Sequence, residues 1–198
     1  MRLRYKLSLC VLFAAVVVTG SVLLAAYGVL RHVSITVEDA SLTGFALLTS
    51  PVTALAYNLS LTLAIKNPNW VININNTEQL MADYSFDGQH FERVQVSDEG
   101  EELPASKTRV YRLVTGSGSN LYVVLDNAAA VPEYRKQNAT GTFEVEVKLT
   151  GEFRYTARYT KCKLEATCPL KLQLQLAPWS SSVFEKVKCK LAKPEKYC

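Results

Sequence analysis

The sequence predicts a mainly β protein, with a single N-terminal transmembrane helix followed by a two-layer β-sandwich that carries one amphipathic helix. Residues 7–30 form an apolar run of 24 residues without a charged side chain. After this run, apolar and polar residues alternate along many short segments, which is typical of strands with one buried face. Turn-forming residues separate these segments. We therefore predict a basic tip at 1–6, a transmembrane helix at 7–30 and one extracytoplasmic domain at 31–198.

The apolar run is long enough to cross a membrane. As a helix it would extend ~36 Å, against a hydrocarbon core of ~30 Å. Arg2, Arg4 and Lys6 precede the run, and no acidic residue occurs before Glu38. Because basic ends stay in the cytosol, the run predicts a signal anchor with a cytosolic N-terminus and an extracellular C-terminus.

A cleaved signal peptide is the alternative to an anchor. Its apolar core would span about 7–15 residues, which is shorter than this run, although Ala25 and Ala26 supply the small residues of a cleavage site. The length favours the anchor. Both alternatives place the same domain outside the cell.

The charge balance of that domain argues against a nucleic-acid surface. The chain has 22 Lys and Arg against 18 Asp and Glu. Three of the basic residues lie in the tip, so the rest carries 19 basic against 18 acidic residues. A nearly neutral domain lacks the basic stripe that phosphate backbones require.

Four of the five cysteines lie near the end of the chain, on the predicted oxidising side. An even number of exported cysteines favours disulfides, and the absence of a C-x-x-C spacing argues against zinc. Cys168 and Cys189 fall on the apolar sides of alternating segments, so we predict this pair, which leaves Cys162 and Cys198 for the second. Four cysteines allow three connectivities, and the sequence leaves the other two open. Cys10 lies within the apolar run.

Three N-glycosylation sequons lie in the predicted extracellular domain, at Asn58, Asn75 and Asn138. Each has Ser or Thr two residues later and no proline between. Together with the anchor and the late cysteines they form a consistent pattern of export. We predict that all three asparagines carry glycans.

The first strands are predicted from alternation and from the residues that interrupt it. Residues 33–37 are β-rich and start the first strand, whereas Gly44 and Pro51 break regular structure in the mixed segment 38–55. Residues 57–66 alternate strictly, so they form a strand with one buried face.

Asn67, Pro68 and Asn69 end this strand. Pro68 fixes its own φ and favours extended geometry in the residue before it, and Asn is common in turns. Residues 70–74 then resume as a second strand.

A hairpin follows. Residues 80–86 and 89–96 are β-like, and Asp87 and Gly88 between them suit a type I′ turn, which needs positive φ at both central positions. Residues 107–114 return to a strand.

Residues 119–138 predict the one amphipathic helix of the domain. Their apolar residues recur at helical spacing. Ser119 or Asn120 can cap the start of the helix, and Asn138 and Gly141 end it. Pro132 should kink the helix or start a second turn. The last strands are expected at 143–149, at 153–159 beyond Gly151, at 168–176 and at 187–191.

No arrangement of residues supports catalysis, a metal or a cofactor. His32 lies at the membrane and His90 in a hairpin arm. The acidic segment 97–106 lacks the alternating ligands of a calcium loop. Glu144 and Glu146 lie side by side on a solvated strand face rather than as a catalytic pair.

The order of these features resembles a known family. The chain resembles the plant non-race-specific disease resistance / harpin-induced-like proteins. The shared features, in order, are a basic tip, one span, a strand over 61–66 that ends in Asn67, Pro68 and Asn69, a hairpin, an Ala-rich helix before a strand, and late cysteines. The ectodomain of these proteins is the late embryogenesis abundant group 2 domain.

This resemblance implies an immunoglobulin-like or fibronectin-III-like sandwich that faces the apoplast from the plasma membrane. It also implies a non-enzymatic role in interaction or signalling during plant defence or stress. The expected partners are the membrane and protein or cell-wall components outside the cell. Ser21 and Ala25 have the small-residue spacing that supports a homo-oligomer of spans. The alternative function is a lipid-binding or lipid-transfer module, in which the sandwich opens to hold an acyl chain.

Overall fold

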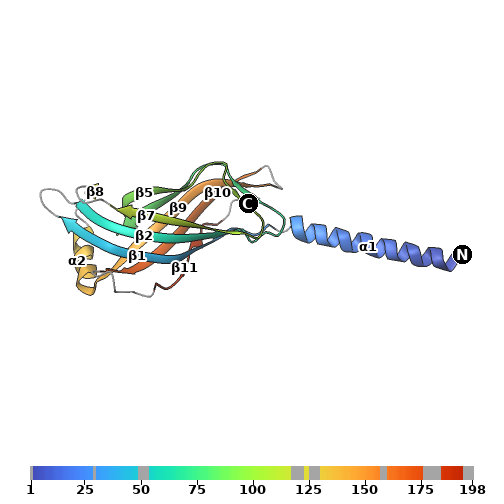
Figure 1. Cartoon of the computed structure of the whole chain (residues 1–198), viewed down its shortest axis with the longest axis horizontal. Helices are drawn as coiled ribbons and strands as arrows, with labels where there is room; N and C mark the ends of the chain where they lie inside the picture. The colour runs from blue at the N-terminus through green and yellow to red at the C-terminus, as the bar shows by residue number, and fades with distance from the viewer. Residues whose placement is uncertain are drawn as a thin grey trace.

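The computed structural model describes residues 2–28, 30–48, 54–116, 123–124, 130–156, 160–175 and 184–193. Two antiparallel sheets face each other, and one long helix extends away from one end of them (Figure 1). The predicted mainly β sandwich is therefore confirmed at the level of its architecture.

The first sheet has the order β11-β1-β2-β7, and β8 also pairs with β2. Its strands are β1 (Ser34–Leu48), β2 (Ala54–Lys66), β7 (Thr108–Gly116), β8 (Val123–Val124) and β11 (Val187–Lys188). The second sheet has the order β12-β10-β9-β3-β6, with β4 on β9 and β5 on β4. Its strands are β3 (Ile74–Asn76), β4 (Leu80–Phe86), β5 (Gln89–Ser97), β6 (Glu102–Leu103), β9 (Thr142–Tyr155), β10 (Lys161–Gln173) and β12 (Lys190–Leu191).

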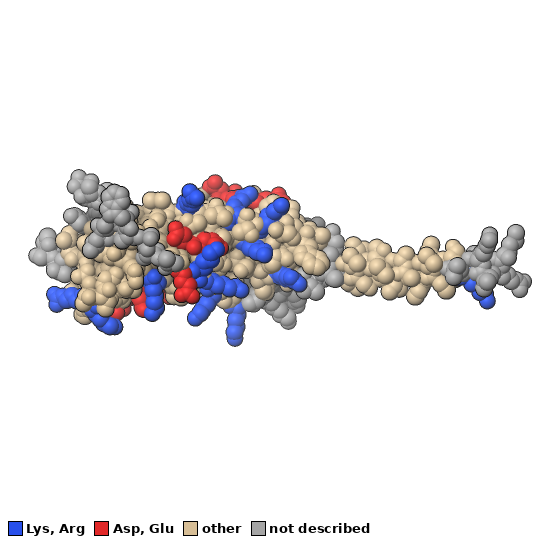
Figure 2. Space-filling model, turned by 60° about the horizontal axis from the view of Figure 1, so that its bottom comes forward, with Lys and Arg blue, Asp and Glu red and all other residues tan. Residues whose placement is uncertain are grey.

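The N-terminal run is helical, as α1 (Arg2–Gly28). Its described side chains are those of residues 6 and 8–24, and the apolar ones among them are exposed. Figure 2 shows this part of the helix without charged side chains and outside the sandwich. The surface of the sandwich itself carries charges of both signs. Within the described part of the chain, no helix combines the length and the apolar character that a membrane span needs.

The predicted segment 7–30 covers most of this helix and Leu30 beyond it. The helix ends at Gly28, and Leu30 packs against the sandwich core. An apolar side chain just beyond a helix gains more by joining a core than by extending the helix into water. The domain that the sequence places at 31–198 thus begins its packing one residue earlier.

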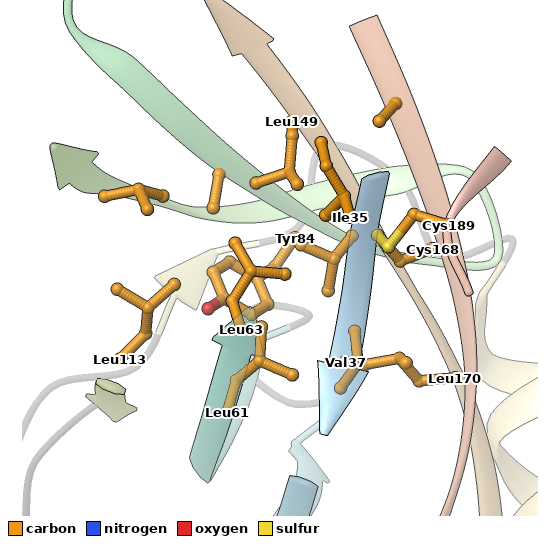
Figure 3. Close-up of a cluster of buried hydrophobic side chains, with 14 of the residues drawn as sticks. Ile35, Val37, Leu61, Leu63, Tyr84, Leu113, Leu149, Cys168, Leu170 and Cys189 are labelled. Carbon is orange, nitrogen blue, oxygen red and sulfur yellow. A yellow bond between two sulfur atoms is a disulfide. The ribbon is translucent and has the colours of Figure 1, made fainter. Parts of the chain in front are cut away.

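The core lies between the two sheets and consists of the inward-facing residues of each strand. Ile35 and Val37 of β1 and Leu63 of β2 face Tyr84 of β4 and Leu149 of β9 (Figure 3). All five are fully buried. Burying a side chain of this size stabilises the fold by about 1.5–3 kcal/mol.

Strand β2 has the predicted alternation from Tyr57 to Leu63, where the odd-numbered residues are buried and the even-numbered ones more exposed, but Ala64 is buried as well. Strand β1 is longer than predicted, because Gly44 does not break it. A register shift between Leu42 and Gly44 absorbs the irregularity as a bulge, and pairing with β2 continues to Leu48. A glycine inside a strand pattern often marks a bulge of this kind. Pro51 lies outside the described residues.

The predicted hairpin is confirmed. Strand β4 ends at Phe86 and β5 begins at Gln89, and the two residues between them have positive φ, 49° at Asp87 and 73° at Gly88. Type I′ geometry requires this sign at both positions, and glycine adopts it without a steric penalty.

Two other strand predictions were wrong in their extent. Trp70 and Val71 form a bend and not a strand, because the chain first has to leave the end of β2, and β3 begins only at Ile74. Gly151 does not separate two strands. It lies within β9, opposite Leu164 of β10, so 142–155 is one continuous strand.

The predicted helix at 119–138 was wrong at Val123 and Val124, whereas residues 119–122, with the predicted caps Ser119 and Asn120, and residues 125–129 lie outside the described residues. Val123 and Val124 form β8 on the edge of β2, where β-branched side chains pack well. The helix is α2 (Ala130–Thr140). Pro132 lies in its first turn, where a missing N–H costs nothing. Gly141, with φ of 67°, ends it as predicted.

A disulfide joins the two sheets near the end of the chain. Cys168 on β10 is bonded to Cys189, the predicted pair. Cys189 lies between β11, which pairs with the first sheet, and β12, which pairs with the second. Its N–H donates to the Ile35 carbonyl at 3.0 Å. Cys162 is also disulfide-bonded, and its predicted partner Cys198 lies outside the described residues, so that pair stays a prediction.

Loss of the Cys168–Cys189 bridge should destabilise the domain. The bridge closes a loop with a sequence separation of 21, which constrains the unfolded chain by about 3 kcal/mol. We expect the double replacement Cys168→Ala with Cys189→Ala to lower the free energy of unfolding by that amount in chemical denaturation. Cys10→Ala, which removes a free exposed thiol, is the control and should change nothing. Equal stability of all three proteins would contradict the assignment.

Tyrosines that lie wholly or partly in the core give the domain a stability that depends on alkaline pH, and burial raises the pKa of one of them, Tyr84. Burial, and then the hydrogen bond that Tyr57 donates to Glu92, raise the pKa of Tyr57 to about 12. Burial and the hydrogen bond to Glu101 raise the pKa of Tyr111 to about 12. The unfolded chain ionises at about 10, so between about pH 10 and 12 the unfolded state binds fewer protons than the folded state. Stability therefore falls as pH rises through this range.

Chemical denaturation at about pH 9 and about pH 11 tests this dependence. We expect a lower free energy of unfolding at the higher pH. Tyr57→Phe should reduce the difference between the two values, because it removes one of the tyrosines whose pKa is raised. A pH-independent free energy of unfolding would contradict the expectation.

Candidate functional site at the helix-proximal end

A buried network of asparagine amides closes the end of the sandwich from which α1 extends (Figure 1). The network begins at Asn67, which follows the last residue of β2 and is fully buried. Its Nδ2 donates to the Ile72 carbonyl at 2.8 Å and to the carbonyls of Leu103 and Pro104 at 3.2 and 3.3 Å. Its backbone N–H donates to the Lys107 carbonyl at 2.9 Å. One side chain thus holds the two loops that leave β2 and β6.

The Oδ1 atom of Asn67 completes the network on its other side. It accepts hydrogen bonds from the backbone N–H of Asn69 at 3.0 Å and from the Asn69 Nδ2 at 2.9 Å. Pro68 between them has a fixed φ and no N–H to satisfy. The three residues therefore form a tight turn whose polar groups are paired without exposure to water, which is what burial requires.

Asn69 carries the network to the segment that follows α1. Its Nδ2 donates to the Arg31 carbonyl at 2.8 Å, and its Oδ1 accepts from the Arg31 N–H at the same distance. The amide thus pairs with both backbone groups of Arg31, as a neighbouring strand would. The Tyr155 hydroxyl also donates to the Arg31 carbonyl, at 3.3 Å. The turn after β2 and strand β9 of the other sheet thereby hold the chain three residues after the helix ends.

The backbone of Asn69 is fastened as well. Its carbonyl accepts from the Ser106 N–H at 2.8 Å, and Ser106 has a positive φ of 57°. Asn73 ties the neighbouring loop, because its Oδ1 accepts from the Ala105 N–H at 2.9 Å. We call Arg31, Asn67, Pro68 and Asn69 the tether site.

The sequence indicated part of this site. Asn67, Pro68 and Asn69 were predicted as a family motif and as the end of a strand. Arg31, the carbonyls of Ile72 and Leu103, and Tyr155 were missed, because backbone acceptors and long-range partners leave no pattern in the sequence. The signal that could have found the site is an Asn pair directly after a buried strand, where at least one amide must be paired with backbone groups.

The three predicted glycan sites differ in exposure. Asn58 on β2 and Asn138 on α2 are exposed, on different parts of the sandwich, whereas Asn75 on β3 is only partly exposed. The Asn75 Oδ1 is buried, and the hydroxyl of Thr77 in the same sequon donates to Glu152 at 2.7 Å. The geometry favours Asn58 and Asn138 as acceptors over Asn75.

The interior leaves little room for a ligand. Among the described residues, the cavity at the core near Val33, Ile65 and Leu103 holds about 20 Å³, which is about one water molecule. An acyl chain would need far more, so this cavity does not favour the lipid-holding alternative. A larger open groove of about 900 Å³ lies between α2 and residues 184–188.

The groove is lined mainly by polar and charged side chains of both signs. Lys171 of β10 pairs with Glu144, its neighbour on β9, at 2.8 Å in the wall of the groove, and Lys186 pairs with Glu38 beside it. Exposed pairs of this kind are worth little in stability. Within the described residues, no cluster of three or more His, Cys, Asp or Glu side chains could hold a metal ion.

Comparison with known proteins identifies no family for this chain. No family model and no curated protein matches it. One solved structure, a protein from Archaeoglobus fulgidus, covers 71% of this chain and 99% of its own length at 8% sequence identity, with a TM-score of 0.33. A likeness this weak carries no argument about the function of this chain.

Replacing Asn67 by Asp should destabilise the domain strongly. Asp has the same shape but lacks the Nδ2 donor, so three carbonyls would face a carboxylate in a buried site. We expect a loss of about 2–4 kcal/mol in the free energy of unfolding, measured by chemical denaturation at neutral pH.

Gln173→Glu is the matched control, because it makes the same amide-to-acid change at an exposed position on β10. It should leave stability within about 0.5 kcal/mol of the native value. An Asn67→Asp protein as stable as this control would show that the tether site does not hold the fold.

Proposed function

We propose that this protein is a single-pass plasma-membrane glycoprotein whose sandwich stands outside the cell as a non-enzymatic component of interaction or signalling in plant defence or stress responses. The proposed anchor is the segment 7–30, with the N-terminus in the cytosol. The observation that carries the proposal is the join between helix and sandwich. A helix that carries no charge after Lys6 ends at Gly28, and Arg31 is already fastened by the tether site.

The exposed side chains of α1 support the anchor. Most of its apolar residues have half or more of their surface free, for example 71% at Phe13 and 73% at Leu24. A soluble protein rarely leaves a contiguous apolar surface of this extent uncovered. The hydrocarbon chains of a bilayer would cover this surface. The uncharged sequence extends beyond residues 8–24 on both sides, from Leu7 to Leu30.

The disulfide and the sequons support the proposal that the sandwich lies on the extracellular side of the membrane. Disulfides persist in oxidising compartments, and the one between Cys168 and Cys189 closes the sandwich. Asn58 and Asn138 offer exposed amides on that same domain. The role in defence or stress rests on the resemblance of the tether-site residues and their sequence order to the harpin-induced-like proteins.

Membrane extraction of the full chain, tagged at its C-terminus and expressed in plant cells, tests the anchor and its orientation. We expect the protein to stay in the membrane pellet after an alkaline carbonate wash, with the tag protected from protease in sealed microsomes. Release by carbonate would overturn the anchor. A chain that starts near Tyr27 would instead indicate the cleaved form.

Glycan mapping tests the extracellular side residue by residue. Asn58→Gln and Asn138→Gln should each increase gel mobility by one glycan, and endoglycosidase should abolish the difference from the native chain. Asn75→Gln should have the smallest effect, because the side chain is partly buried. A native chain whose mobility endoglycosidase leaves unchanged would contradict extracellular exposure.

Proximity labelling from the sandwich tests the interaction role. With the labelling enzyme fused to the C-terminus in living tissue, we expect enrichment of plasma-membrane and cell-wall proteins, and a changed set after treatment with a pathogen elicitor. A set dominated by cytosolic proteins, or one that the elicitor leaves unchanged, would contradict the proposed role.

A further inference from the structure

The bend after the tether site exposes a large aromatic side chain. Trp70 has 72% of its surface exposed and Val71 next to it has 45%. Tryptophan buries a large apolar area when it packs in a core, so this side chain contributes little to the sandwich itself. Nothing in the turn requires it, because the hydrogen bonds there are made by its neighbours Asn67 and Asn69.

The position of Trp70 relative to α1 is closely defined. Asn69, the preceding residue, pairs through its side chain with the backbone of Arg31. Arg31 follows the last helical residue, Gly28, by three positions, a distance of at most about 10 Å for an extended chain. Trp70 therefore lies at the end of the sandwich that faces the helix, within a short distance of the helix terminus.

A positive charge accompanies the ring. The Arg31 guanidinium lies 6.0 Å from the centre of the Trp70 ring, which is the outer range of a cation–π contact. Trp at the level of lipid head groups and Arg beside a span are the two residue types that anchor membrane proteins at the interface. The indole places its apolar body in the lipid and its N–H among polar groups.

Exposed apolar residues also occur on β7, and one of them lies far from the helix. Val110 and Val114 lie on the outward face of β7, with 55% and 76% of their surfaces exposed. Val114 pairs in register with Ser60, six residues before the end of β2, so it is remote from the tether site. It serves as a matched control for exposure without proximity to the helix.

We propose that Trp70, Val71 and Arg31 insert into the head-group layer of the membrane that α1 crosses and hold the sandwich in a fixed orientation on that surface. This inference rests on the proposed anchor. The span alone would leave the sandwich free to tilt about residues 28–30. A second contact beside the span removes that freedom.

Fluorescence quenching by lipid in vesicles tests the insertion. The test protein is the full chain with Trp179→Phe, which leaves Trp70 as its single tryptophan. It is reconstituted into phosphatidylcholine vesicles that contain lipids brominated close to the head group. The control combines Trp179→Phe, Trp70→Phe and Val114→Trp, which moves the single tryptophan to the remote exposed site.

We expect the fluorescence emission of Trp70 to be blue-shifted and strongly quenched by brominated lipid. The emission of the Val114→Trp protein should show neither the blue shift nor the quenching. Equal quenching of the two proteins would overturn the inference. Flotation of each protein with the vesicles is measured in the same samples. A protein that floats with unquenched Trp70 refutes the insertion alone, whereas a protein that does not float refutes the anchor.

Hydroxyl-radical footprinting of the native chain provides the second measurement, which needs no variant. Oxidation of Trp70, read by mass spectrometry of its peptide, should drop when the protein is moved from detergent to vesicles. Oxidation of the peptide that contains Val114 should not change. An unchanged oxidation of Trp70 would contradict the proposal.

Discussion

The fold depends on the pairing of two buried amides at the end of β2. Asn67 and Asn69 are almost fully buried, and a buried amide without partners would cost about 1–3 kcal/mol for each group left unpaired. The structure meets this constraint by bringing three separate segments to the same point: the loop before β3, the end of β6 and Arg31, three residues after Gly28. The requirement for hydrogen bonds thus determines where the loops lie.

The Cys168–Cys189 disulfide fastens the last part of the chain to the sandwich, as the amide network fastens the segment after the helix. Cys189 is fastened to β1 through its N–H and to β10 through its sulfur. The two short strands on either side of it pair with different sheets. The amide network therefore holds the chain near the helix, and the disulfide holds the late segment between the sheets. Each fastening links elements that are far apart in the sequence and that apolar packing alone would not fix in register.

The features that the sequence predicted well are those with a local cause. Alternation placed β2, the Asp87 and Gly88 turn followed from backbone sterics, and the side-chain parity of Cys168 and Cys189 gave their pairing. The errors came where tertiary context decides. Gly44 is absorbed as a bulge because β2 pairs on both sides of it, and Val123 and Val124 become a strand because the edge of β2 is open to them. For the tether site, the asparagines were visible in the sequence but their partners at Arg31 and Tyr155 were not.

Under the proposed anchor, the tether site acquires a mechanical consequence. A sandwich joined to a span by a long flexible segment would sample many orientations, because each free residue adds conformational entropy. Here the chain is fastened to the sandwich from Leu30 and Arg31 onward, since Leu30 packs against the core and the Asn69 amide holds both backbone groups of Arg31. The same short connection brings Trp70 close to the end of the helix. The buried amides of Asn67 and Asn69 thereby contribute to the stability of the sandwich and also position Trp70 near the end of the helix. A change at Asn69 would therefore alter both the stability and the position of Trp70.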